Sequence, residues 1–212
     1  MTRIFIVRHG ETDGNQKKIY RGHWDLPLNK NGKSQVKKAG EALKSIRLDA
    51  IYTSPLKRAV QTAEAVAAHQ DVEPEEDESL IDIDYGDWTR LPDAEVAEKF
   101  PDQYRQWRRS PEAVLFPGGE GLPSVRARVE PALKQLAEEH PDQTIALASH
   151  RVPIKLLLCS ALGLEDSAFW QIQIDTASIS ALDYTNGNFN LIFSNETCHL
   201  KSFGDKLGVV DF

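Results

Sequence analysis

Two short apolar runs, each leading to a segment that contains a histidine, constrain the fold of this chain most. Residues 4–7 run into Arg8 and His9, and residues 144–148 are followed after one serine by His150. Apolar runs of this length are typical of strands buried within a sheet. Segments with helical periodicity separate the strands, and this alternation predicts a mostly parallel central sheet with helices on both faces. The expected fold is therefore a three-layer α/β/α sandwich.

Helical periodicity and turn residues indicate where the expected elements begin and end. Ser54 and Pro55 favour a helix start, with the serine as N-cap and the proline in the first helical position. The helix over residues 123–139 is expected to be interrupted, or to restart, near Pro131. The Asn-Gly pair at residues 186–187 is typical of a tight hairpin. Strands are expected at residues 3–7, 50–53, 144–148, 178–184 and 189–194, and the other helices at residues 32–46, 54–68 and 152–162.

Length, charge and cysteine content limit the organisation and the partners of the chain. We expect a single domain over residues 1–212, with a small helical insertion at about residues 92–117. A formal net charge of −7 argues against a nucleic-acid or membrane-binding protein. The first residues lack the profile of a signal peptide, so a cytoplasmic location is expected. Cys198 and His199 alone lack the ligand number of a zinc site.

Basic and nucleophilic side chains mark corresponding ends of three separate elements. Arg8 and His9 follow the first strand, Arg58 lies near the start of a helix, and His150 follows the strand at residues 144–148. The carboxyl ends of parallel strands share one edge, where α/β proteins place their ligand sites. Arginine binds phosphate oxygens with a planar fork of donors, and neutral histidine is a nitrogen nucleophile. The pattern therefore favours the capture of a phosphoryl group by His9.

At this point the chain closely resembles the histidine phosphatase superfamily, whose members share the phosphoglycerate mutase-like fold. The resemblance covers nearly the whole chain. It rests on ordered motifs at residues 8–12 (Arg-His-Gly-Glu-Thr), 21–28, 54–63, 80–88, 117–120 and 149–150. Within the family, the chain is most similar to the metal-independent phosphoserine phosphatase branch, through residues 169–170, 175–178 and 195–200.

The resemblance implies roles for particular residues. His9 becomes phosphorylated. The phosphoryl group is held by three further side chains, those of Arg8, Arg58 and His150. Polar groups of the long loop at residues 10–31 also bind the substrate, at Asn15, Arg21 and Gly22. No metal or other cofactor is expected, because the arginines and histidines replace the electrostatic role of a metal ion.

The leaving alkoxide needs a proton donor. The family usually has a glutamate in this role, in a Leu-x-Glu-Ile-x-x-Gly pattern, whereas the corresponding residue here is Asp82. Its side chain is shorter by one methylene group, and we expect it to serve as the donor. Asp84 and Glu11 are the alternatives if Asp82 is only a polar loop residue.

Two further departures from the family pattern concern the substrate. Arg151 stands where the family usually has a glycine, and its side chain either binds a substrate carboxylate or points to solvent. Tyr85 stands where the phosphoserine phosphatase branch typically has a histidine, and we place it in the substrate-binding wall. The resemblance implies a small phosphorylated metabolite as substrate, with L-phosphoserine the best candidate, and a homodimer as the assembly.

Other functions within and beyond this class stay open. Arg108 and Arg109 resemble a paired-arginine motif that grips phosphoglycerate in cofactor-dependent mutases. A mutase must keep water from its phosphohistidine, and the short insertion here favours a phosphatase. Phosphatases that act on α-ribazole phosphate or on sugar phosphates are closely related alternatives to a phosphoserine phosphatase. The departures at Asp82 and Arg151 leave room for a phosphate-binding regulatory module without turnover.

Overall fold

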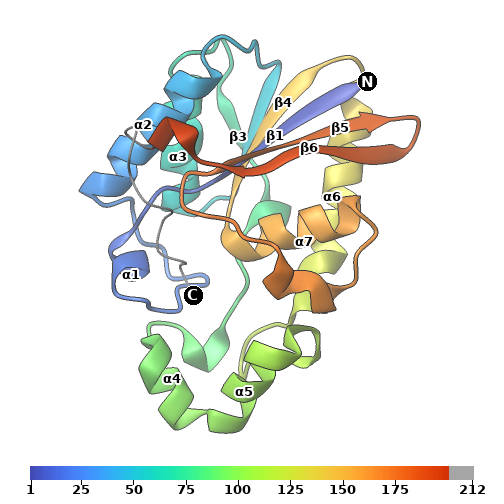
Figure 1. Ribbon diagram of the computed structural model, residues 1–212. Coiled ribbons are helices and arrows are strands. Elements are labelled where there is room, and N and C mark those ends of the chain that lie inside the picture. The colour runs from blue at the N-terminus through green and yellow to red at the C-terminus, as the bar shows by residue number, and fades with distance from the viewer. Residues whose placement is uncertain (201–212) are drawn as a thin grey trace.

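A six-stranded sheet forms the centre of the computed structural model, which describes residues 1–200 (Figure 1). The strands lie in the order β3-β2-β4-β1-β5-β6. The four strands from β3 to β1 are parallel, whereas β5 and β6 continue the sheet antiparallel. The strand bounds are β1 Thr2–Arg8, β2 Ala50–Thr53, β3 Pro74–Glu76, β4 Thr144–Ser149, β5 Ile179–Thr185 and β6 Asn188–Glu196. The predicted α/β/α sandwich with a mostly parallel sheet is confirmed.

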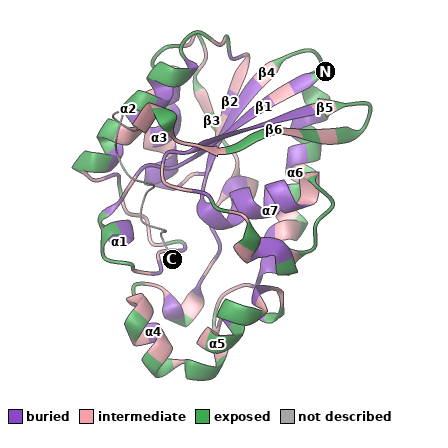
Figure 2. Ribbon diagram, viewed as in Figure 1, coloured by how far each residue is buried: buried purple, intermediate pink, exposed green. Residues whose placement is uncertain are grey.

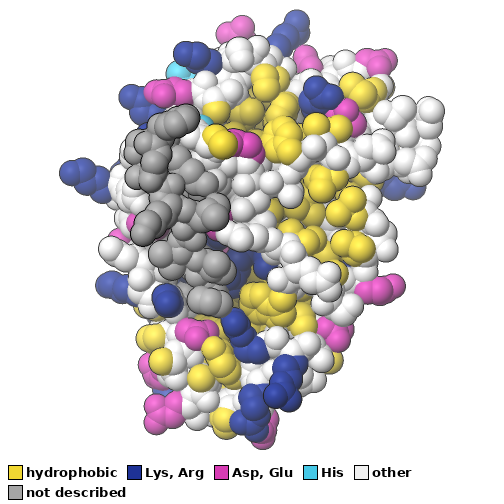
Figure 3. All heavy atoms as spheres, viewed as in Figure 1, with side chains coloured by type: hydrophobic (Ala, Val, Ile, Leu, Met, Phe, Trp, Pro, Cys, Tyr) yellow, Lys and Arg dark blue, Asp and Glu magenta, His cyan; other side chains and the backbone are white. Residues whose placement is uncertain are grey.

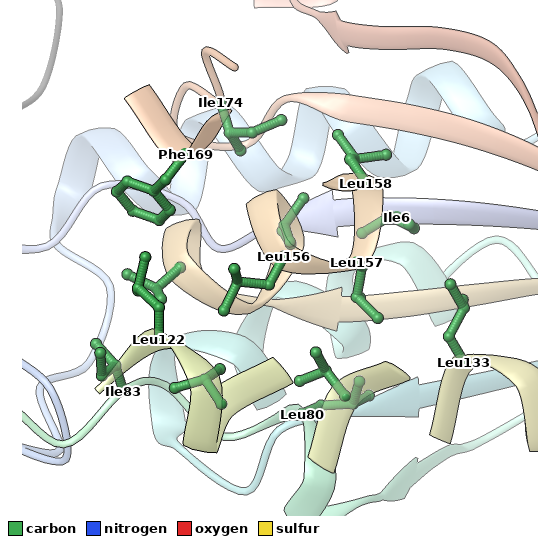
Figure 4. Packing of buried hydrophobic residues seen from close by; sticks show 14 of the residues in the cluster. Ile6, Leu80, Ile83, Leu122, Leu133, Leu156, Leu157, Leu158, Phe169 and Ile174 are labelled. Atoms are coloured by element: carbon green, nitrogen blue, oxygen red, sulfur yellow. The ribbon is translucent and has the colours of Figure 1, made fainter. Parts of the chain in front are cut away.

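Helices cover both faces of the sheet, and alternate side chains of β1 show how. Ile4 and Ile6 pack in one apolar cluster with α6 (Leu122–Glu139) and α7 (Arg151–Ala161). Phe5 and Val7 pack on the other face with α2 (Lys30–Leu43) and α3 (Lys57–Ala67). Figure 2 shows the resulting buried layers, and Figure 4 shows Ile6 among side chains of α6 and α7. Because both faces of β1 are buried, its sequence is apolar at every position between residues 4 and 7.

Two short helices, α4 (Asp93–Lys99) and α5 (Pro101–Arg109), lie apart from these layers, beyond the carboxyl ends of the parallel strands (Figure 1). Trp107 anchors α5, with its buried ring 5.2 Å from that of Phe169 and 5.2 Å from that of Trp170. The single domain over residues 1–212 stays a prediction, and its last residues, 201–212, lie outside the described part. Within residues 1–200, none of the helices is long and apolar enough to cross a membrane.

The start of α3 differs from the expectation. The helix begins at Lys57, its N-cap is Leu56, and no side chain caps it. The prediction of Ser54 as the N-cap is therefore wrong. The Ser54 hydroxyl accepts from the Leu56 N–H at 3.3 Å, before the helix begins, and it also lies 2.7 Å from Nε2 of His150, so the same group makes a tertiary contact.

The helix α6 also departs from the expectation, because it runs unbroken through Pro131. A proline removes one backbone donor from a helix and normally bends or breaks it. Here residues before and after the proline, including Val129 and Leu133, are buried in the same apolar cluster. Tertiary packing thus keeps α6 helical on both sides of the proline.

The elements at one edge of the sheet agree with the sequence-based expectation, and the strand at the other edge differs from it. The hairpin between β5 and β6 turns at Asn186 and Gly187, which have positive φ angles of 52° and 82°, as the sequence predicts. The short edge strand β3 is not expected from the sequence, because its residues are acidic rather than apolar. Its place at the sheet edge leaves the side chains of Glu75 and Glu76 exposed to water.

Candidate active site

Three neighbouring strands bring the predicted site residues together. His9 follows β1, and its backbone N–H donates to the Ser149 carbonyl oxygen of β4 at 3.0 Å. His150 follows β4, and its ring centroid lies 5.2 Å from that of His9. Arg58 comes from α3, which follows β2, the other neighbour of β4. The parallel pairing of the strands therefore places groups that are far apart in the sequence at one edge of the sheet.

The hydrogen bonds of His9 identify which ring nitrogen can attack. Nδ1 lies 2.6 Å from the Gly10 carbonyl oxygen. A carbonyl oxygen only accepts hydrogen bonds, so Nδ1 carries the proton and Nε2 keeps its lone pair. The pKa of His9 is held well below its ordinary value by burial and by the charges of Arg58, Arg8 and Arg21. His9 is therefore neutral at physiological pH, with Nε2 as a nucleophile.

Arg58 connects the groups around the nucleophile. Its Nε donates to Nδ1 of His150 at 3.1 Å, and its Nη2 donates to Oδ2 of Asp82 at 3.0 Å and to the Gly22 carbonyl oxygen at 2.8 Å. Because Nδ1 of His150 accepts, the proton of that ring lies on Nε2, which donates to the Ser54 hydroxyl. Burial and the Arg58 charge hold the pKa of His150 well below its ordinary value. Arg58 thus sets the tautomer of the second histidine.

Asp82 lies between Arg58 and His150. Its exposed fraction is 6%, and its Oδ2 is 3.8 Å from Nδ1 of His150 as well as bonded to Arg58. The two alternative donors are engaged elsewhere. The Asp84 carboxylate accepts from the Gly86 backbone N–H, and that of Glu11 accepts from the Asn29 side chain.

The backbone that carries Asp82 is fixed by one arginine of α6. Arg128 donates to the carbonyl oxygens of Ser79, Ile81 and Asp82 at 2.7, 2.6 and 3.0 Å. His23, from the loop at residues 10–31, adds an Nε2 contact of 2.8 Å to the same Asp82 oxygen. The segment has no regular secondary structure between residues 81 and 85, so these side chains replace the hydrogen bonds that a helix or strand would supply.

A narrow pocket lies beside His9 and Asp82. It is lined by His9, Lys18, Ile19, Tyr20, Arg21, Asp82, Tyr85, Arg151 and Val152. Arg8, Arg58 and His150 are fully buried behind these lining residues. Arg8 donates to the Ile174 carbonyl oxygen at 2.7 Å, and its charge acts on His9.

The other substrate-binding candidates divide between the pocket and its surroundings. Arg21, Tyr85 and Arg151 line the pocket. Gly22 lies behind it, and its positive φ of 47° turns the chain so that its carbonyl oxygen reaches Arg58. Asn15 lies outside the lining, and its side-chain oxygen accepts from the Thr12 N–H at 3.0 Å within the capping box of α1 (Asp13–Gln16).

The sequence alone does not single out some of the residues that line or support the pocket. Lys18 and Tyr20 belong to the predicted loop at residues 10–31, but nothing in their spacing indicates which of its side chains face the pocket. Ser54 and Arg128 act through partners far away in the sequence. The arginines of α5, Arg108 and Arg109, are exposed and lie outside the lining. Within residues 1–200, no group of three or more His, Cys, Asp or Glu is placed to hold a metal ion.

Comparisons with known proteins identify the family and agree with the fold. A family model described as the histidine phosphatase superfamily (branch 1) matches residues 4–197. Phosphoserine phosphatase 1 of Hydrogenobacter thermophilus is 37% identical over 203 residues, which are 96% of each chain. The solved structure of YhfR from Bacillus stearothermophilus has a TM-score of 0.91 at 26% identity, covering 95% of this chain and 100% of that one. A phosphoserine phosphatase from Entamoeba histolytica, solved with phosphoserine, has a TM-score of 0.84 at 26% identity, with coverage of 95% and 100%.

Proposed function

The chain belongs to the histidine phosphatase superfamily (branch 1), and on this basis we propose that it hydrolyses a small phosphomonoester through a phosphohistidine on His9. Its membership of this family, together with a relative that is named as a phosphatase, identifies the chain as a phosphoric monoester hydrolase. The observation that carries the proposed mechanism is the neutral His9 ring, with its Nδ1 proton facing the Gly10 carbonyl oxygen and its Nε2 lone pair available.

The proposed reaction has two displacement steps. Nε2 of His9 forms a bond to phosphorus while the bond to the leaving oxygen breaks, and that oxygen takes a proton from Asp82. A water molecule then gives a proton to Asp82 and attacks phosphorus, and the N–P bond breaks with its electron pair returning to Nε2.

Cationic and polar groups hold the phosphoryl group during this reaction. We assign this role to Arg8, Arg58 and His150, with Arg21 and the backbone at Gly22 completing the cradle. Asn15 orders the start of the same loop through its contacts to Thr12. Charge-assisted hydrogen bonds of this kind stabilise the charge that develops on the equatorial oxygens, which is the role a metal ion plays elsewhere. The reaction accordingly needs no metal ion.

L-Phosphoserine is the substrate we propose. The relative that is 37% identical over 96% of the chain is named phosphoserine phosphatase 1, and a second phosphoserine phosphatase shares the fold. Tyr85 is compatible with a small substrate, since it is 5% exposed and narrows the pocket beside Tyr20. We also predict that the protein forms a homodimer and that it is located in the cytoplasm.

The decisive experiment is phosphate release from L-phosphoserine in the presence of EDTA, with wild type compared with His9→Ala. We expect release by wild type alone, and an acid-labile phosphoenzyme that His9→Ala does not form. Equal release by both proteins would contradict the role of His9. Release that stops with EDTA would contradict the metal-independent reaction. Absence of release from both would remove L-phosphoserine as the substrate. Conversion of 3-phosphoglycerate into 2-phosphoglycerate would favour a mutase.

A further inference from the structure

Arg151 has an unusual position within the pocket. It begins α7 directly after His150, it is only 8% exposed, and it lines the pocket that contains His9. Buried arginines normally occur where they meet an anion or a fixed set of acceptors. The site described above assigns the phosphoryl group to Arg8 and Arg58, and leaves the chemical use of Arg151 open.

The charge of Arg151 acts on a different part of the pocket from the phosphoryl-binding arginines. The arginine charges that lower the pKa of His9 are those of Arg58, Arg8 and Arg21. Arg151 acts on the two tyrosines of the wall, where its charge opposes the burial that raises the pKa of Tyr85 and Tyr20. Its side chain also hydrogen-bonds to Tyr85, on which the Arg21 charge has a smaller effect of the same sign. The pocket therefore contains two cationic positions, one behind His9 and one beside the tyrosines.

Aromatic rings and a neighbouring lysine hold this second position in place. The Arg151 guanidinium lies 5.9 Å from the ring centroid of Trp170. One turn later on α7, the amine of Lys155 lies 4.9 Å from the same ring and donates to the Phe169 carbonyl oxygen at 3.1 Å. Burial, followed by the charge of Arg151, lowers the pKa of Lys155 to about 6. At neutral pH the lysine is mostly uncharged, so the fixed cation of this pair is Arg151.

We propose that Arg151 forms a second anion-binding position, which takes the carboxylate of the substrate. This inference rests on the proposed function and narrows it to phosphomonoesters with a carboxylate close to the phosphoryl group. One planar guanidinium matches the single charge and the two oxygens of a carboxylate. The phosphoryl dianion, by contrast, has two buried arginines of its own. Lys18 lines the exposed part of the same pocket and adds positive charge to its entrance.

A matched pair of substrates tests the assignment. O-Phospho-L-serine and O-phosphoethanolamine share the phosphoryl and amino groups and differ by the carboxylate. For Arg151→Met we expect kcat/KM on phosphoserine to fall by about 10- to 100-fold, the range for loss of one charged hydrogen bond. The value on phosphoethanolamine should stay within about twofold. Arg151→Lys, which keeps the charge, should recover part of the loss.

Controls separate this contact from general damage to the protein. Arg105→Met removes an exposed arginine of α5 outside the pocket and should leave kcat/KM on both substrates unchanged. Thermal unfolding of each variant checks that the fold is intact. Equal losses on both substrates with Arg151→Met, or no loss on either, would overturn the assignment.

A binding measurement keeps the inference testable if the protein does not turn over either compound. Calorimetry on His9→Ala should give tighter binding of phosphoserine than of phosphoethanolamine, and the added Arg151→Met change should abolish the difference. Preference in binding without turnover would contradict the proposed hydrolysis and support the carboxylate position. Turnover without any preference would support hydrolysis and overturn the carboxylate position. Absence of a preference in both assays would also overturn it.

Discussion

The position of a single proton decides whether His9 can attack phosphorus. The Gly10 carbonyl oxygen holds that proton on Nδ1, and three nearby arginines disfavour a second one on Nε2. The same arginines attract the phosphoryl dianion. In the proposed mechanism, one set of charges therefore keeps the nucleophile neutral and brings the substrate to it, which would explain why cations surround a histidine that must not become a cation.

Removal of one of these charges should change the pH dependence of the reaction. In Arg21→Met the lowering of the His9 pKa weakens, so His9 gains a proton at a higher pH than in wild type. The acid limb of kcat/KM should therefore move to higher pH. Both proteins are measured with the same substrate, so the titration of the substrate itself cancels in the comparison. An acid limb at the same pH in both would contradict the electrostatic role of Arg21.

Replacement of Asp82 should affect substrates according to their leaving groups. Asp82→Asn cannot donate a proton, so hydrolysis of L-phosphoserine should fall by about 100- to 10,000-fold. p-Nitrophenyl phosphate releases a stable anion that needs no proton, and its hydrolysis should fall far less. Asp82→Glu introduces the usual family residue and should keep activity on both. The decisive measurement is the ratio of the two rates, and an unchanged ratio in Asp82→Asn would remove Asp82 as the donor.

At the scale of elements, the segment that carries Asp82 depends on a helix to hold it. Residues 81–85 form neither helix nor strand, and Arg128 of α6 binds three carbonyl oxygens of residues 79–82. The guanidinium is a fork of several donors, so one side chain fixes the direction of the whole segment. We therefore expect Arg128 to be a positioning residue, which acts on the proposed reaction through Asp82.

Loss of this support should lower turnover on the substrate that needs a proton donor. In Arg128→Met the Asp82 carboxyl is less well placed, and we expect kcat on L-phosphoserine to fall by about 10-fold or more. The KM should change little, because the phosphoryl-binding arginines remain. On p-nitrophenyl phosphate kcat should stay near the wild-type value, which a general loss of folding would not allow. A matched control is Arg105→Met on the exposed side of α5. Equal falls in kcat on both substrates would contradict a positioning role.

Over the whole molecule, most basic side chains lie at the surface. Figure 3 shows Lys and Arg side chains spread over this face, with several of them over α5, beyond the carboxyl ends of the strands. The net charge of the chain is −7, because acidic side chains outnumber these basic ones. Lys155 is a buried basic group, like Arg8, Arg58 and Arg151, since it is 4% exposed on α7.

The burial of Lys155 should make the stability of the fold depend on pH. Its pKa is about 6 in the folded protein and about 10.4 in an unfolded chain. Between these values the unfolded state binds more protons, so the free energy of unfolding rises with pH, by up to about 1.4 kcal/mol per pH unit from this residue. The two buried histidines, whose pKa values in the folded protein lie well below 6.5, add to this rise only near and below pH 6.5, where an unfolded histidine still binds protons.

Urea unfolding at pH 6.5, 7.5 and 8.5 measures this slope. Lys155→Met keeps most of the buried stem and removes the titrating amine, so the rise in stability with pH should become flatter. Lys37→Met, at an exposed position of α2, should leave the slope unchanged. If Lys155→Met and wild type gain stability equally over this pH range, the assignment of the slope to Lys155 is wrong.

The sequence by itself determined the elements of the fold and the residue types of the site. Apolar runs and helical periodicity indicate which face of a strand or helix is buried. These patterns are local in the sequence, so they are sufficient to predict β1, β4 and the β5–β6 hairpin. The meeting of His9 and His150 also follows, because the carboxyl ends of neighbouring parallel strands share one edge. The resemblance to a known family added which of these groups attacks and which donates a proton.

Only the tertiary structure decided which side chains pair across elements. Ser54 matches the local pattern of an N-cap but lies before the start of the helix and also bonds to His150, and Pro131 lies in a helix that continues through it. Arg151 and Lys155 look alike in sequence, as two basic residues one turn apart, yet burial leaves one as a fixed cation and lowers the pKa of the other. These outcomes depend on the distances between groups that are remote along the chain. Local patterns contain no record of those distances, because they are set by how whole elements pack.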